Sequence, residues 1–441
     1  MAHSPRTATL DGGVAVALAI SLGLVFAADR FTPARVVPDQ PPVVVTPHEE
    51  ESARVTLRPR QPHLVSGRDQ PNEEESAPVP LRLAVTPPNY DDMGKLLREL
   101  GEGYKFTDIH LEDLEDGAKL ANFDVVFFTC GTGAPGWFTG EAMGAAGRPG
   151  VQTLRFDPAA LERLRVALRA FVEKGGTLYA SDWRLTYLRI IFPELAEGGV
   201  VESGAAQTLT ADVVDPGLRE RIGSTVELKF DLPDWMPARL NARGATEYLR
   251  GRYRTNATGE TIESGQPANS SATTGHRPNS TGETVESPLL VRVPFGQGAI
   301  IFTSFHNEKV NSELETKLLQ FLVFTAVTAK ETQKSRSTML TGGFVPRSES
   351  LLDASPSNPK VTQTYEHNKR GKLRFALSFN NQGARLKLSV KGPNGVALDK
   401  EGTSTFSIDV DNAETGRWSY TITALKLPHE HFPYSLTIGG E

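Results

Sequence analysis

Short apolar runs alternate with segments of helical period through the middle of the chain. The runs at 81–88, 106–111, 124–131 and 177–180 are too short for helices and are typical of buried strands. The segments between them repeat leucine at helical spacing, and Asp157-Pro158 supplies the capping residue and the first-turn proline that begin a helix. This β-α-β-α order predicts a parallel sheet with helices on both faces.

The pattern changes after about residue 199, where strands replace the alternation with helices. A stretch rich in Thr, Ser, Gly and Asn at 255–287 predicts a disordered insertion between two strands. A helix capped by Ser312, with Glu315 three residues later, closes an α/β domain over 81–330. A linker is predicted at 331–359, and alternation at hairpin spacing over 360–441 predicts a C-terminal all-β sandwich.

The N-terminal segment predicts export or attachment to a membrane. Residues 12–28 form an uncharged apolar run with the length of a signal-peptide core, and an uncleaved membrane anchor is the alternative. Residues 29–80 are rich in Pro and Glu and show no hydrophobic period, so they predict a disordered linker. We therefore expect a globular part that is periplasmic, at the cell surface or membrane-anchored outside the cytoplasm.

The composition and the motifs of the chain exclude several classes of binding partner and cofactor. The 441 residues include 47 Lys and Arg against 53 Asp and Glu, and the net charge of −6 argues against a nucleic-acid partner. The single cysteine, Cys130, excludes an internal disulfide framework and a multi-cysteine zinc site. No Walker A loop and no Gly-x-Gly-x-x-Gly motif follows the first strand, so no cofactor is predicted.

Polar residues that could take part in catalysis or binding follow the ends of the predicted parallel strands. In open α/β sheets ligands bind outside these carboxyl ends, so we expect the side chains to share one crevice. The central strand at 177–180 ends directly in two of them, Ser181 and Asp182. The complete set is Asn89, Tyr90, Asp91, Cys130, Thr132, Ser181, Asp182, His306 and Glu308.

Residues 81–330 resemble the class I glutamine amidotransferase-like superfamily, which includes a trehalose-utilisation-like branch. Segment 124–131 resembles the strand before the oxyanion-hole loop, 175–183 resembles the strand and turn that carry the nucleophilic Cys, and Phe305-His306-Asn307-Glu308 resembles the strand end that supplies the catalytic His and Glu. The resemblance implies a flavodoxin-like sheet. The turn here reads Ala180-Ser181-Asp182-Trp183 without the glycine-flanked Cys, so the glutaminase activity does not carry over. The C-terminal module resembles small sandwiches appended to exported bacterial proteins.

Four uses of this sheet edge compete. The first is binding without chemistry, and the second is hydrolysis with Ser181 as nucleophile, His306 as base, and Glu308 or Asp182 orienting the base. The third is a reactive Cys130 thiolate paired with His306, and the fourth is a weak cation site of His306 with Asp182, Glu308 or Asp91.

We favour the first use, a non-catalytic binding or interaction protein without a metal site. Its ligand is predicted to be a carbohydrate or a protein, held at the carboxyl edge of the sheet. The residues expected to contact this ligand are Asn89, Tyr90, Asp91, Cys130, Thr132 and Asp182.

Overall fold

The computed structural model describes residues 78–131, 133–137, 156–197, 200–240, 244–256, 260–263, 274–276, 282–306 and 313–441. All of these belong to one compact unit, Asp69–Glu441. The predicted signal peptide or anchor at 1–28 and nearly all of the predicted linker at 29–80 lie outside the described residues. Within the described part of the chain, no helix combines the length and the apolar character needed to cross a membrane.

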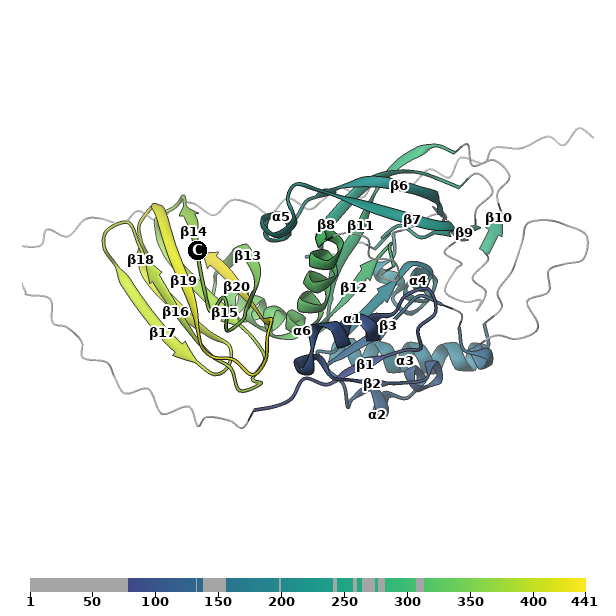
Figure 1. Cartoon of the computed structure of the whole chain (residues 1–441), viewed down its shortest axis with the longest axis horizontal. Helices are drawn as coiled ribbons and strands as arrows, with labels where there is room; N and C mark the ends of the chain where they lie inside the picture. Colours follow the sequence, from purple (N-terminus) through teal and green to yellow (C-terminus); the bar gives the residue numbers. More distant parts are fainter. Residues whose placement is uncertain are drawn as a thin grey trace, which may run out of the picture. The chain divides into compact units, whose positions relative to one another are not determined.

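A nine-stranded mixed sheet organises the α/β domain, with strand order β2-β1-β3-β4-β12-β11-β8-β6-β7 (Figure 1). The first five strands in this order are parallel, and their 2-1-3-4-5 arrangement is the flavodoxin-like one, with β12 as the fifth strand. The remaining strands add an antiparallel extension. The strands are β1 (Leu83–Val85), β2 (Phe106–Asp108), β3 (Val125–Phe128), β4 (Thr177–Ser181), β6 (Gly204–Val213), β7 (Thr225–Trp235), β8 (Thr246–Arg254), β11 (Thr284–Phe295) and β12 (Gly298–Thr303). The predicted flavodoxin-like sheet is confirmed.

Helices cover both faces of the parallel part of the sheet. The α-helices are α1 (Met93–Leu100), α2 (Gly117–Leu120), α3 (Pro158–Glu173), α4 (Leu185–Ile191), α5 (Pro216–Ile222) and α6 (Glu313–Thr341), and short 3₁₀ turns are η1 (Glu102–Tyr104), η2 (Leu111–Glu115), η3 (Pro135–Trp137), η4 (Asp182–Arg184) and η5 (Pro193–Leu195). The predicted start of α3 is confirmed, because the Asp157 carboxylate accepts a hydrogen bond from the Ala160 N–H. Helix α3 ends at Glu173, and Gly175, just after the C-cap Lys174, has a φ of 106°, a left-handed value suited to glycine.

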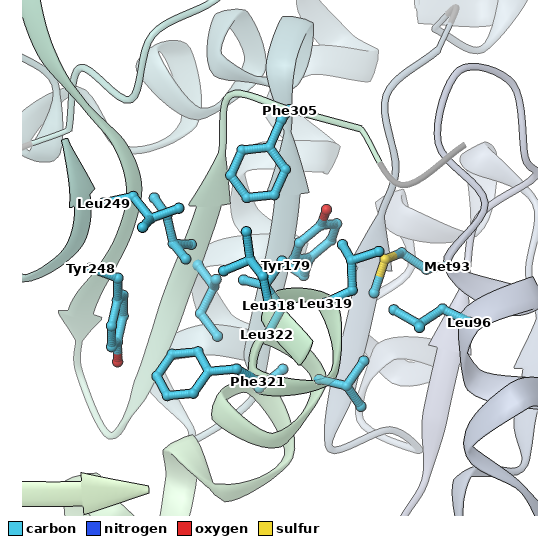
Figure 2. Close-up of a cluster of buried hydrophobic side chains, with 14 of the residues drawn as sticks. Met93, Leu96, Tyr179, Tyr248, Leu249, Phe305, Leu318, Leu319, Phe321 and Leu322 are labelled. Atoms are coloured by element: carbon cyan, nitrogen blue, oxygen red, sulfur yellow. The ribbon is translucent and has the colours of Figure 1, made fainter. Parts of the chain in front are cut away.

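Strand β4 separates two apolar clusters, one on each face of the sheet. Tyr179 packs on the face covered by α1 and α6, together with Met93 and Leu322 (Figure 2). Leu178 and Ala180 point to the opposite face, where they pack with residues of α3 and α4. Because side chains alternate along a strand, Ser181 belongs to the same face as Tyr179. This alternation decides which groups Ser181 meets at the end of the strand.

The predicted disordered insertion at 255–287 needs a correction. Two short strands inside it, β9 (Glu260–Glu263) and β10 (Thr274–His276), form a small sheet of order β10-β9-β5 with β5 (Val200–Glu202). Strand β11 also begins within the predicted range, at Thr284. The stretch is rich in Thr, Ser, Gly and Asn, so the sequence carries no apolar alternation that would have predicted these strands. Residues 257–259, 264–273 and 277–281 of the predicted range lie outside the described residues.

The predicted linker at 331–359 is wrong. Helix α6 continues to Thr341, and the following β13 (Val345–Ala354) is a strand of the sandwich. The sandwich consists of two four-stranded sheets of order β13-β20-β15-β18 and β14-β19-β16-β17, and it therefore begins at β13 (Figure 1). Its other strands are β14 (Lys360–His367), β15 (Gly371–Ser378), β16 (Arg385–Lys391), β17 (Ala397–Gly402), β18 (Phe406–Ala413), β19 (Gly416–Lys426) and β20 (Phe432–Gly440).

A buried charge cluster joins the sandwich to the α/β domain. Glu349 on β13 accepts hydrogen bonds from Arg292 on β11 at 2.7 Å and from Arg336 on α6 at 2.9 Å. Burial alone would raise the pKa of Glu349, but the charges of Arg292 and Arg336 outweigh it and hold this pKa below its ordinary value. The negative charge of this carboxylate thus balances the positive charges of two largely buried guanidinium groups.

Replacing Glu349 by alanine should therefore strongly destabilise the protein. The substitution leaves Arg292 and Arg336 without their counter-charge, which costs about 3–5 kcal/mol for a buried pair. The matched control is Glu366→Ala, which breaks the exposed pair with Arg417 and should cost less than about 1 kcal/mol. Urea unfolding of both variants measures the difference, and equal losses would contradict a role for Glu349 in the interface.

Candidate functional site

The turn after β4 places Asp182 at a strained backbone position. Ser181 is still extended, with φ −130° and ψ 144°, whereas Asp182 has a φ of 47°. A left-handed φ is unfavourable for most side chains but is tolerated by Asp and Asn. The residue at the tip of the turn is therefore Asp182, and Ser181 is the last residue of the strand.

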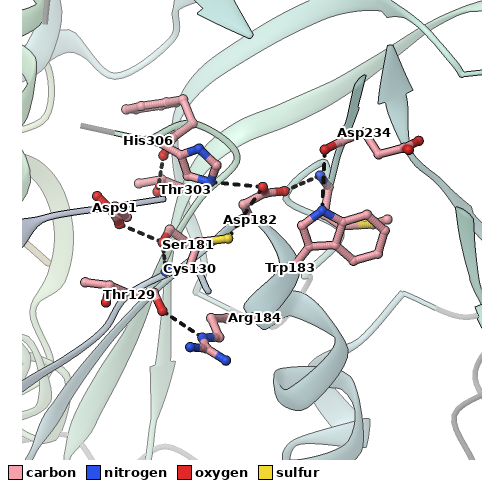
Figure 3. A network of polar contacts seen from close by, with 12 residues as sticks. Asp91, Thr129, Cys130, Ser181, Asp182, Trp183, Arg184, Asp234, Thr303 and His306 are labelled. Atoms are coloured by element: carbon pink, nitrogen blue, oxygen red, sulfur yellow. Dashed lines mark hydrogen bonds and ion pairs between the residues drawn. The ribbon is translucent and has the colours of Figure 1, made fainter. Parts of the chain in front are cut away.

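The Asp182 carboxylate is fully buried and contacts three groups (Figure 3). Oδ1 accepts a hydrogen bond from the Met236 N–H at 2.6 Å, which comes from the segment after β7. Oδ2 lies 3.0 Å from His306 Nε2 and accepts a longer 3.7 Å contact from Cys130 Sγ. The His306 contact is an ion pair whose N–H bond points off the line to the oxygen, so it is not a well-aligned hydrogen bond.

The proton of this pair resides on the His306 ring. Burial alone would lower the pKa of His306, but the close contacts with Asp182 and Cys130 and the charge of Asp182 raise it to about 11. Burial raises the pKa of the Cys130 thiol, and the neighbouring Asp182 charge raises it further, against an opposing effect of His306. Burial also raises the pKa of the Asp182 carboxyl, but the His306 contact, the Met236 N–H and the Cys130 thiol oppose this effect, so we place the shared proton on the His306 ring and leave the Cys130 thiol neutral.

Ser181 belongs to a second polar network on the other side of the strand end. Its Oγ donates a hydrogen bond to Asp91 Oδ2 at 2.7 Å and accepts one from the Cys130 N–H at 2.9 Å. The Tyr179 hydroxyl donates to the same Asp91 oxygen at 3.1 Å and also contacts Thr303 Oγ1 at 3.1 Å. Ser181 and His306 thus contact different carboxylates, Asp91 and Asp182.

The structure brings most of the candidate residues to one sheet edge. The exposed Asn89 side chain lies against Gly131, where an added Cβ would come within 2.9 Å of it, and the Tyr90 ring stacks 6.3 Å from the His306 ring. Thr132 and Glu308 lie outside the described residues. The backbone of Met236 was not singled out from the sequence, because a main-chain N–H leaves no signal in residue type.

An open cleft begins beside His306. It encloses about 790 Å³, open solvent included, and lies between the outer strand β7, the end of β12 and the start of α6. Its polar wall consists of Lys229, Asp231, Ser304, His306 and Glu315. The buried Ser304 Oγ in this wall has no hydrogen-bond partner among the described residues. A ligand hydroxyl or a water would satisfy it.

Comparisons with known proteins give similarities of fold alone. No protein-family model matches the sequence, and no curated protein matches it. Solved structures similar to this chain include a ThuA-like protein from Bacteroides uniformis, at 12% identity and TM-score 0.34, covering 60% of this chain and 97% of that one. A glutamine amidotransferase from Thermotoga maritima matches at 12% identity and TM-score 0.30, covering 60% and 94%. TmCBM61, solved in complex with β-1,4-galactotriose, matches at 14% identity and TM-score 0.15, covering 22% and 87%. Such low scores carry no functional argument, and the fold assignment rests on the strand order.

The raised pKa of His306 predicts a specific dependence of stability on pH. A folded-state pKa of about 11, against an ordinary 6.5, means that the charged ring stabilises the fold fully below pH 6.5 and loses this effect as pH rises toward about 11. The stability advantage of the wild type over His306→Gln should therefore shrink across this window in urea unfolding. The exposed His110→Gln controls for loss of a histidine. An advantage that grows with pH would contradict the ion pair.

Proposed function

We propose that this chain is a non-catalytic binding protein, built on a glutamine amidotransferase-like scaffold and carried outside the cytoplasm by its N-terminal segment. Its ligand occupies the cleft beside His306, and its chemical class is a neutral carbohydrate. The observation that carries the proposal is the fully buried Asp182, with both oxygens engaged, at the tip of the turn after β4. The apolar run at 12–28 is the support for export.

The turn after β4 supports binding over catalysis. A nucleophile needs access to substrate and a partner that can take its proton. Asp182 has no exposed surface, and its oxygens contact Met236, His306 and Cys130. The Cys130 thiol is also buried, and its raised pKa disfavours the reactive thiolate.

The geometry gives no support to a hydrolase that uses Ser181 with His306. The Ser181 hydroxyl is buried and donates a hydrogen bond to Asp91, while the His306 ring keeps its own proton beside Asp182. A base that is already protonated cannot accept the proton of a serine nucleophile. The Ser181 hydrolase is accordingly the weaker proposal.

The wall of the cleft supports a neutral, hydroxylated ligand. Lys229 supplies a positive charge and Asp231 and Glu315 supply negative ones, so donors and acceptors are mixed without one strong sign. The unsatisfied Ser304 hydroxyl adds a group that a sugar hydroxyl could bond. Apolar residues such as Phe305 and Leu319 complete the lining, as is usual in ligand sites.

Removing the Ser304 hydroxyl should weaken binding without unfolding the protein. One hydrogen bond to a neutral partner contributes about 0.5–1.5 kcal/mol, so Ser304→Ala should raise the Kd about 3–10-fold. The measurement is calorimetric titration of the full chain with oligosaccharides selected from a glycan array. The matched control is Ser287→Ala, another buried serine whose Oγ has no partner among the described residues but which does not line the cleft.

Three outcomes would contradict the proposal. If Ser304→Ala, Ser287→Ala and the wild type bind with equal affinity, the ligand does not bind in this cleft. If the wild type hydrolyses ester or glycoside substrates and both Ser181→Ala and His306→Gln lose this activity, the protein is a hydrolase and the binding hypothesis is wrong. Binding to a peptide array and to no glycan would reject the carbohydrate class.

A further inference from the structure

Three different metal-ligating side chains meet at the carboxyl ends of neighbouring parallel strands. The Cys130 Sγ, the Asp182 carboxylate oxygen and a ring nitrogen of His306 all lie within 4.8 Å of one another. Cys130 follows β3, Asp182 follows β4 and His306 follows β12, and β4 pairs with both other strands. The rigid centre of the sheet thus holds the three groups together.

We propose that Cys130, Asp182 and His306 form a binding site for a divalent transition-metal ion, with Zn²⁺ as the best fit. Thiolate, carboxylate and imidazole are the side chains that bind zinc in proteins. A thiolate and a carboxylate together carry two negative charges, which one Zn²⁺ neutralises. Among these three side chains a hard cation such as Ca²⁺ would find one carboxylate, whereas it prefers six to eight oxygen ligands, so this set suits Zn²⁺ better.

The distances are close to those of a tetrahedral site. With metal–ligand bonds of about 2.0–2.3 Å, the ligand atoms of tetrahedral zinc lie about 3.3–3.6 Å apart. In this structure Asp182 Oδ2 lies 3.7 Å from Cys130 Sγ and 3.0 Å from His306 Nε2. Small side-chain rotations would bring these pairs, and the third pair within its 4.8 Å limit, to the required spacing.

The groups around the three ligands also suit a metal site. The Met236 N–H holds Asp182 Oδ1 at 2.6 Å, which leaves Oδ2 directed at the other two ligands. Hydrogen bonds of this kind orient ligating carboxylates in known metal sites. The His306 Nε2 is not committed to a well-aligned hydrogen bond, so its ring can turn toward an ion.

Three protein ligands leave a fourth coordination position for a small molecule or water. His306 also lines the open cleft, so the three ligands lie next to the side on which we place the ligand of the proposed function. From the sequence alone, His306 groups with carboxylates only, which predicts a weak hard-cation site. Because Cys130 lies close by, the possible metal ligands include a soft thiolate sulfur and a borderline imidazole nitrogen beside the hard carboxylate oxygen. The metal site does not depend on the proposed carbohydrate binding.

Cobalt substitution tests the site directly. The metal-stripped full chain is titrated with Co²⁺, and bound cobalt with a thiolate ligand gives an intense near-ultraviolet charge-transfer band. Because Cys130 is the only cysteine in the chain, this band reports on Cys130 alone. We expect one Co²⁺ per chain, displacement of the band by Zn²⁺, no band in Cys130→Ser, and at least about tenfold weaker binding in His306→Gln.

The exposed His110→Gln is the matched control and should keep the wild-type band and affinity. A cobalt spectrum without a thiolate band in the wild type would overturn the proposal, even if Cys130→Ser fails to fold. The same holds for a band that survives in Cys130→Ser. Glycan binding that persists in such a protein would leave the proposed function standing, so the two failures are distinguishable.

Discussion

The buried contact between the Asp182 carboxylate and the His306 imidazolium is the interaction on which the carboxyl edge depends. A lone carboxylate without any exposure would be strongly unfavourable, and it would also have to hold the φ of 47° at the turn. The positive ring, the Met236 N–H and the Cys130 thiol together compensate it. Through these contacts Asp182 joins the ends of three parallel strands to the segment that follows the antiparallel strand β7.

This arrangement does not fit glutamine hydrolysis, the reaction of the amidotransferases that residues 81–330 resemble. In the amidotransferases that residues 81–330 resemble, the corresponding turn presents a reactive Cys to substrate. In this chain the carboxylate of Asp182, at the turn after β4, is buried. The cleft beside His306 is the place where we propose that the ligand binds. A proton on His306 and a metal ion among the three side chains are alternative ways to balance the same negative charge, and both leave the Ser181–Asp91 network unchanged.

Much of the fold was predictable from the sequence, and the site was predictable in part. The parallel strands and the capped start of α3 follow from apolar runs and from Asp157-Pro158, which act locally. The extension of α6 past residue 330 was missed because its polar surface resembles a linker. Its buried Thr332 and Ser335 hydroxyls instead bond Ser435 and Ser378 of the sandwich. Residue chemistry singled out Ser181, but strand alternation turns Ser181 toward Asp91 and leaves Asp182 at the tip. Backbone φ and main-chain donors such as Met236 cannot be read from residue type.

The protonation state of His306 tests the central claim most directly. In ¹⁵N-detected NMR of the metal-free protein, with the His306 signals assigned from the spectrum of His306→Gln, the ring nitrogens report their protons individually. At a pH between 6.5 and about 11, the account predicts that both His306 nitrogens are protonated. A neutral His306 ring with a single protonated nitrogen in that window would contradict it.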